Sequence, residues 1–320
     1  IQLALFQGFR DYSVGGVDLI RYYRTYNTLA QYNWFEVKQF DDGENILYYL
    51  INNVFAKSHV PYQTFLLVVS IFCVIVTVWF IYKHSDYPFL SIALILGLQL
   101  YTFQFSGLKQ SLSMACALIA FDANMERKNA KTIIWTLASI LFHFAGMVIV
   151  PYLIFMRLKI TRNKLVVYFF SMIAIIMFRV QIGRFLVVLF RESYIGRYTS
   201  AGAIGGTALF LLIVALLYLY CFYEPISRGL FNNNDARKPK KRGVSLILPQ
   251  KQRIMTVQDE LVNEELNASF YGLFILVTIQ LCASFSYTFT RINMYFIPML
   301  TLAFSSILNS QKIQKRFKPY

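Results

Sequence analysis

The chain has 320 residues, of which 57% are hydrophobic, 17% aromatic and only 15% charged. Because an average soluble domain carries about 25% charged residues, this composition predicts an integral membrane protein. The formal net charge of +15 would suit a nucleic-acid partner, but lysines and arginines held in cytoplasmic loops explain such an excess in a polytopic membrane protein. We therefore expect no nucleic acid among its partners.

The first predicted element is a polar segment, residues 10–60, which follows a short apolar stretch. Residues 1–6 indicate the outer end of a membrane helix that begins before residue 1. Residues 9–24 concentrate arginines and aspartates among glycines and tyrosines, and charged groups beside a membrane indicate a functional site by default. Residues 44–51 predict an amphipathic helix lying on the membrane surface.

Hydrophobic runs then predict about nine or ten transmembrane or half-membrane helices in a single all-α membrane domain, residues 1–320. His143 and Gly146 interrupt one run, which has basic residues at both ends. This favours two half-length helices meeting near His143 over one straight crossing. The runs cover residues 62–82, 88–105, 108–121, 132–156, 165–190, 205–223, 269–285 and 292–308.

The four cysteines all lie inside these runs, without metal-ligand spacing. We expect them to act as small core residues, and we expect neither a metal nor another cofactor. They are Cys73, Cys116, Cys221 and Cys282.

The basic residues set the expected orientation. The basic loop at 224–266 and the C-terminal tail belong in the cytoplasm by the positive-inside rule, although binding of anionic lipid is another role for that loop. The polar segment 10–60 and the loop 184–205 then face outward. This leaves a set of outward cations that the rule does not predict: Arg10, Arg21, Arg24, Lys109, Arg184, Arg191, Arg197 and Arg291.

These outward cations predict a ligand with several negative charges, because planar guanidinium groups bind phosphate oxygens in bidentate fashion. The alternative is that they snorkel to the membrane surface or pair with Asp11, Asp18 and Glu192.

Five short motifs follow one another along the chain. They are Arg10 with Gly15-Gly16-Val17-Asp18 and Tyr22-Tyr23; Glu44 with Leu47-Tyr48; Phe105-Ser106-Gly107-Leu108-Lys109-Gln110; Leu141-Phe142-His143-Phe144; and Arg291 with Tyr295-Phe296. In this order the chain resembles the EpsG family of Wzy-like bacterial polysaccharide polymerases. Many members carry arginine before the glutamine where this chain has Lys109, which keeps the positive charge and loses the forked geometry.

The resemblance implies a GT-C-like, metal-independent membrane glycosyltransferase in the bacterial cytoplasmic membrane, with an active site that faces outward. Such an enzyme joins undecaprenyl-diphosphate-linked oligosaccharide repeat units into a capsule, exopolysaccharide or O-antigen-type polymer. An acceptor hydroxyl attacks the anomeric carbon of the growing chain, and lipid diphosphate leaves. The implied partners are the lipid-linked glycan, membrane lipids, a chain-length regulator and a flippase.

The reaction requires groups that stabilise the departing diphosphate, groups that accept the hydroxyl proton, and groups that hold sugars. The diphosphate candidates are Arg10, Arg21, Lys109, Arg191, Arg197 and Arg291. The catalytic candidates are Asp18, His143, Asp11 and Glu192, and the sugar-binding candidates are Tyr22, Tyr23 and Glu44.

Structural roles stay open for three of the catalytic candidates. Asp18 can pair with Arg21 or Arg24, His143 can bond to a carbonyl group, and Glu192 can pair with Arg197. A lipid-linked oligosaccharide flippase or another polytopic transporter is the competing function, and other membrane glycosyltransferases or acyltransferases are also open. The sequence has no internal repeat, and its polar residues are concentrated on one face, which favours the polymerase.

Overall fold

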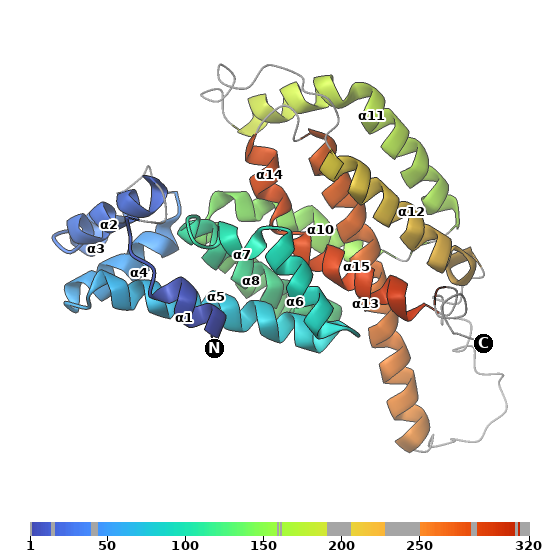
Figure 1. Cartoon of the computed structure of the whole chain (residues 1–320), viewed down its shortest axis with the longest axis horizontal. Helices are drawn as coiled ribbons and strands as arrows, with labels where there is room; N and C mark the ends of the chain where they lie inside the picture. The colour runs from blue at the N-terminus through green and yellow to red at the C-terminus, as the bar shows by residue number, and fades with distance from the viewer. Residues whose placement is uncertain are drawn as a thin grey trace. The chain divides into compact units, whose positions relative to one another are not determined.

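The computed structural model describes residues 2–13, 17–39, 44–158, 160, 162–190, 206–227, 250–282, 287–310 and 313. All regular elements in those residues are helices, which confirms the all-α prediction for that part of the chain. The chain forms two compact units, residues 1–153 (unit 1) and 154–320 (unit 2). Figure 1 traces the helices of both units.

The polar segment folds into three helices, where the sequence predicted one. Helices α2 and α3 both pack against α4, and the side-chain amide of Asn53 on α4 donates to the carbonyl oxygens of Leu29 (2.6 Å) and Tyr32 (3.0 Å). These bonds tie α4 to the end of α2 and to the turn that follows it. The four N-terminal helices are α1 (Gln2–Gly8), α2 (Val17–Leu29), α3 (Trp34–Gln39) and α4 (Ile46–Lys57).

Helix α5 (Tyr62–His84) is the long apolar helix of unit 1. Its 23 residues reach about 35 Å at 1.5 Å per residue, which suits a bilayer core of about 30 Å. Among the described residues it is the one helix long and apolar enough to cross a membrane, and the other apolar helical stretches in those residues are 10–17 residues long. Pro61 precedes its first turn, and the helix covers the run predicted at residues 62–82.

The run at residues 88–105 is not one continuous helix, contrary to the prediction. Helix α6 (Pro88–Gly97) ends at Gly97, and α7 (Leu100–Phe103) is a separate short helix. Gln99 has φ 64°, in the left-handed region, and a left-handed residue ends a helix because the backbone leaves the helical path there.

Helices α8 (Leu108–Met125) and α9 (Asn129–Phe142) pack closely through small residues. The hydroxyls of Ser113 and Ser139 lie 2.9 Å apart. A Cβ at Gly146 would lie 2.8 Å from the first hydroxyl and 2.7 Å from the second. The small side chains of Ser113 and Ser139, and the absence of a side chain at Gly146, permit this close approach.

The predicted break near His143 is present. Helix α9 ends at Phe142, His143 has an extended backbone (φ −157°, ψ 124°), and a short 3-10 helix, η2 (Phe144–Val148), leads into α10 (Ile149–Met156). The backbone N–H of His143 donates to Ser139 O at 3.1 Å, which closes the end of α9.

In unit 2, helix α13 is the central element, because α11, α12, α14 and α15 all pack against it. It begins at Gln250, so the last part of the segment predicted as a loop at 224–266 is helical. The hydroxyl of Tyr218 on α12 donates to Leu266 O at 2.8 Å. The helices are α11 (Arg162–Phe190), α12 (Gly206–Ser227), α13 (Gln250–Cys282), α14 (Tyr287–Asn293) and α15 (Ile297–Asn309).

The cysteines within the described residues are core residues, as predicted. Cys73, Cys116 and Cys221 are buried and free. The side chain of Cys282 lies outside the described residues.

Candidate functional site

Arg10 is a buried guanidinium group at the end of α1. Only 8% of the residue is exposed. Its Nη1 atom donates to the carbonyl oxygen of Gln7 and to Ser70 Oγ, the latter at 3.3 Å, and its guanidinium carbon lies 5.4 Å from the centre of the Phe105 ring. Its Nε and Nη2 atoms are buried without a hydrogen-bond partner among the described residues. Two parallel N–H donors of one guanidinium group are therefore left for an acceptor.

Arg10 lines a pocket of about 510 Å³, which we call the Arg10 pocket. Ser106 adds a hydroxyl group, and Asp11 adds an exposed carboxylate at the rim. Asp11 Oδ1 accepts from the hydroxyl and the backbone N–H of Ser13, at 2.5 and 2.7 Å, and these bonds hold the pKa of the Asp11 carboxyl below its ordinary value. The lining residues are Phe6, Phe9, Arg10, Asp11, Thr102, Phe105 and Ser106.

Lys109, on the first turn of α8, contacts Tyr48 and Tyr49, and Tyr48 in turn contacts Tyr22. We call these four residues the Lys109 cluster. The ammonium group donates to the Tyr49 hydroxyl, and lies 4.3 Å from the centre of the Tyr49 ring and 5.6 Å from that of Tyr48. Tyr22 on α2 meets Tyr48 edge to face at 5.6 Å. Cation–π contacts hold the charge of Lys109 beside aromatic faces. Two predicted site residues, Lys109 and Tyr22, and motif residue Tyr48 therefore come together from three different helices, and Tyr49 is an addition that the sequence analysis did not name.

His143 lies against Asn45, the residue that starts α4. His143 Nδ1 is 3.0 Å from Asn45 Oδ1, and the backbone N–H of Phe144 donates to the same oxygen at 3.3 Å. The predicted alternative, a histidine bonded to a carbonyl group, is therefore present in the form of a side-chain amide. The bond also fixes the orientation of the ring, as a proton acceptor in a catalytic site requires.

Contacts and short stretches of chain link these three groups within unit 1. The ring of Phe105 faces Arg10, and Lys109 follows it by four residues and reaches Tyr49. Asn45, which contacts His143, immediately precedes α4, and Tyr49, which contacts Lys109, lies on the first turn of that helix. Arg10, Lys109 and His143 thus belong to one connected region, which we take as the candidate site.

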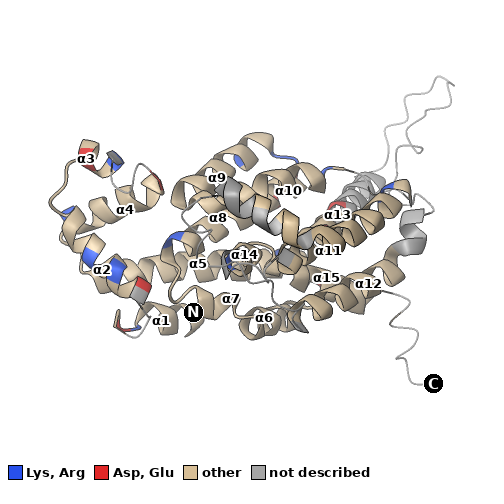
Figure 2. Cartoon of the chain, turned by 90° about the horizontal axis from the view of Figure 1, so that it is seen from above, with Lys and Arg blue, Asp and Glu red and all other residues tan. Residues whose placement is uncertain are grey.

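The remaining candidates of the first segment differ in their surroundings. Asp18 is half-buried on the first turn of α2, where a carboxylate interacts favourably with the helix dipole, and it forms no ion pair with a described residue. The expected alternative pairing with Arg21 or Arg24 is absent, and both arginines are exposed. Tyr23 stacks on Tyr12 with ring centres 4.2 Å apart. Figure 2 shows basic and acidic residues together on α2.

The other predicted residues are described only by their own surroundings. Glu44 is half-buried just before α4, and Arg291 is half-buried on α14 of unit 2. The predicted roles of Arg191, Glu192 and Arg197 fall on residues outside the described ranges, as does the side chain of Arg184. The roles predicted for all these residues stay predictions.

The sequence analysis missed a network of charges at the end of α5, which we call the Asp122 network. The side chain of Asp122, 1% exposed, pairs with Lys83, lies 3.0 Å from His84 Nε2 and 3.8 Å from Lys131 Nζ. Glu126 pairs with Lys83 and Lys128, both at 2.7 Å. A single carboxylate in an apolar helix was the signal that could have revealed the network.

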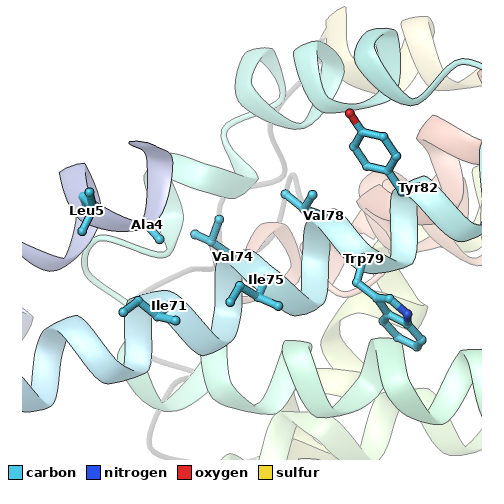
Figure 3. A pocket seen from close by; sticks show the side chains of 8 residues that line it. All are labelled: Ala4, Leu5, Ile71, Val74, Ile75, Val78, Trp79 and Tyr82. Carbon is cyan, nitrogen blue, oxygen red and sulfur yellow. The ribbon is translucent and has the colours of Figure 1, made fainter. Parts of the chain in front are cut away.

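A second pocket, of about 370 Å³, is an apolar groove along α5. Figure 3 shows its side chains at α1 and along α5. It has no charged side chain among its lining residues, and so it offers no acid, base or anion-binding group. The lining residues are Ala4, Leu5, Ile71, Val74, Ile75, Val78, Trp79 and Tyr82.

Comparison with known proteins gives one match. The profile of the EpsG family matches residues 1–318, nearly the whole chain. No curated protein and no solved structure matches it. No group of three or more metal-ligating side chains occurs in the part of the chain that the structure describes. The chain belongs to the EpsG family, which makes it a membrane protein with a general role of the polysaccharide-polymerase type.

Proposed function

We propose that this protein is a multi-pass polymerase of the bacterial cytoplasmic membrane. It joins undecaprenyl-diphosphate-linked oligosaccharide repeat units at the outer face, without a metal ion. The observation that carries the proposal is the buried guanidinium of Arg10, which lines a pocket with two of its nitrogens unpartnered among the described residues, in a chain of the EpsG family.

Arg10 binds the diphosphate of the growing chain in this proposal. A buried charge without a counter-charge costs free energy, and phosphate oxygens would offset that cost by accepting two parallel N–H bonds. Negative charge on the diphosphate grows as the glycosidic bond breaks, so the same bonds become stronger in the transition state. Lys109 adds positive charge to the region from the first turn of α8.

His143 accepts the proton of the acceptor hydroxyl. The hydroxyl oxygen bonds to the anomeric carbon, the bond from that carbon to the diphosphate oxygen breaks with its electron pair on the diphosphate, and the proton moves to the imidazole. Asp11 is less suited to this role, because its bonds to Ser13 lower the pKa of its carboxyl and so weaken it as a base.

Sugar rings bind to the exposed parts of tyrosine rings in the polar segment, residues 10–60. Tyr22 and Tyr23 are half-buried on α2, and Tyr22 is held against Tyr48 by an edge-to-face contact. Tyrosine presents a flat apolar face together with a hydroxyl group, which suits the alternating apolar and polar surface of a sugar.

The direct test is polymerisation by purified protein in detergent. Given synthetic lipid-diphosphate repeat units and neither nucleotide sugar nor ATP, the protein should lengthen the glycan and release one lipid diphosphate for each unit joined. If folded protein instead moves the lipid across liposomes and never lengthens the glycan, the flippase alternative is correct.

The outward position of the site has its own test. Two exposed positions can carry a thiol in a cysteine-free background. Ser58→Cys places it before the start of α5, and Asn129→Cys places it after the end of α8. We expect an impermeant thiol reagent to label the first from outside the cell and the second only after permeabilisation. The reverse pattern would place the Arg10 pocket on the cytoplasmic side.

A further inference from the structure

Asn45 does not do what asparagine usually does at the start of a helix. The residue before a helix commonly caps it with its side chain, but the side chain of Asn45 makes no capping bond to α4. Its Oδ1 atom faces His143 and Phe144 across 98 residues of sequence. Asn45 is 7% exposed and has φ 54°, so a buried amide in a left-handed backbone conformation is used for a contact with a distant segment. Such a departure from local preference is typical of functional sites.

The hydrogen bonds determine which ring nitrogen of His143 carries the proton. The backbone N–H of Phe144 can only donate, so the Asn45 atom that faces it must be the amide oxygen. The same oxygen faces His143 Nδ1 at 3.0 Å, and an oxygen acceptor requires a hydrogen on that nitrogen. Neutral His143 therefore has its proton on Nδ1, and Nε2 carries the lone pair.

We propose that Asn45 is a positioning residue that holds His143 in the Nδ1–H tautomer, so that Nε2 is the atom that takes the proton of the acceptor hydroxyl. This inference rests on the proposed function. Asn45 does not touch the reacting atoms. It sets the orientation and the tautomer of the base, as the partner of a catalytic histidine does in other enzymes.

The chain offers an internal comparison for the tautomer. It contains three histidines, and His84 bonds through Nε2 to Asp122 Oδ1 at 3.0 Å. A carboxylate accepts, so neutral His84 carries its proton on Nε2, the opposite of His143. His59 is exposed with φ 54°, and His59→Asn removes it without backbone strain, because asparagine tolerates the left-handed region.

The test is nitrogen NMR of the full chain with ¹⁵N-labelled histidine, in the His59→Asn background, which leaves two imidazoles. Protonated and unprotonated ring nitrogens resonate far apart, and couplings to the ring protons distinguish Nδ1 from Nε2. His143→Gln assigns the signals. We expect His143 to be protonated at Nδ1 and His84 at Nε2; a neutral His143 protonated at Nε2 would overturn the proposal, whatever the activity of the protein.

Two variants of Asn45 test the catalytic consequence. Both glycine and aspartate tolerate the left-handed backbone, so neither adds the strain that alanine would. Asn45→Gly removes the acceptor, and we expect kcat for glycan elongation to fall at least roughly tenfold, with little change in KM, because the base loses its orientation. Asn45→Asp keeps the acceptor and should retain both the Nδ1–H signal and most of kcat.

The outcomes separate the two proposals. If Asn45→Gly elongates at the wild-type rate while folded, Asn45 is not a positioning residue, although the polymerase assignment stands. If wild-type protein never elongates the glycan, the proposed function fails, and the NMR result still reports the tautomer.

Discussion

The Arg10 pocket and the Asp122 network place cations at different points along α5 and surround them in opposite ways. Arg10 contacts Ser70, and Lys83 is thirteen residues further along, roughly 20 Å at 1.5 Å per residue. Lys83 has two carboxylate partners. Arg10 has none among the described residues, and two of its nitrogens lack any partner there.

The difference separates structure from function. A cation paired with carboxylates has its charge balanced inside the protein, so its role is to tie helices together; Lys83 on α5 and Lys131 on α9 both reach Asp122 on α8. A buried cation without a counter-charge is destabilising in the ligand-free protein. Proteins retain such a group where function requires it, and an anionic ligand is the partner that would balance it.

The largest expected effect is on catalysis, from Arg10→Met, which keeps an apolar stem and removes the charge. We expect elongation to fall about 10²–10³-fold, equivalent to about 2.7–4 kcal/mol, as when one donor to a developing anion is removed. The rate of glycan lengthening by purified protein measures this.

Thermal unfolding of the same variant sharpens the comparison. Stability should be unchanged or higher, because the variant removes an unbalanced buried charge. Arg10→Lys should recover little activity, since an ammonium group cannot make the forked contact. The matched control is Arg24→Ala, at an exposed position on α2, which should elongate normally. A loss of stability without loss of activity in Arg10→Met would show that Arg10 is structural.

The next effect is on stability, from Asp122→Asn. This change is isosteric and leaves Lys83 and His84 without their shared carboxylate. We expect the free energy of unfolding to fall by about 3 kcal/mol, the lower end of the range for breaking a buried ion pair. The lower end applies because Lys83 keeps Glu126 as a partner and is partly exposed. Denaturant unfolding in detergent measures the change. Activity per folded molecule should be close to wild type, and a variant that is fully stable but inactive would move the Asp122 network from structure to function.

A smaller effect is expected at Lys109. Lys109→Met keeps the stem over the tyrosine rings and removes the charge, and we expect elongation to fall about tenfold, or about 1.4 kcal/mol, since the ammonium contacts Tyr48 and Tyr49 and acts on the diphosphate at longer range. Lys109→Arg should retain activity, because guanidinium also stacks on aromatic rings. Equal activity of all three proteins would exclude Lys109 from the reaction.

Local sequence signals predicted what depends on neighbouring residues. The apolar run at residues 62–82 predicted α5, and His143 with Gly146 predicted the break after α9. The end of α6 at Gly97 was missed, because a single glycine within an apolar run is also tolerated inside a helix. The left-handed residue is Gln99, two positions further on, and it is neither glycine nor proline.

Contacts between distant segments could not be predicted in the same way. Arg10 was a candidate from its charge alone, but its burial against Ser70 and Phe105 follows from packing across 60 and 95 residues. Asn45 and His143 are 98 residues apart. Asp122 directly follows the apolar run predicted at residues 108–121 and was unnoticed, because its partners Lys83 and His84 belong to another helix.

The smallest expected effect is the pH dependence of Glu126, at the partly exposed edge of the Asp122 network. The bonds from Lys128 and then Lys83 hold the pKa of the Glu126 carboxyl below its ordinary value. A carboxylate whose pKa is lower in the folded protein contributes stability above its unfolded pKa, about 4.3, and loses it as the pH falls through the folded value. Glu126→Gln should therefore cost under about 1 kcal/mol near neutral pH, as exposed ion pairs do. The difference from wild type should shrink below about pH 4.3 and vanish in stronger acid, as denaturant unfolding over this range would measure. If it persists there, Glu126 stabilises the protein through packing and not through charge, and the contrast between paired and unpaired cations then rests on Asp122 alone.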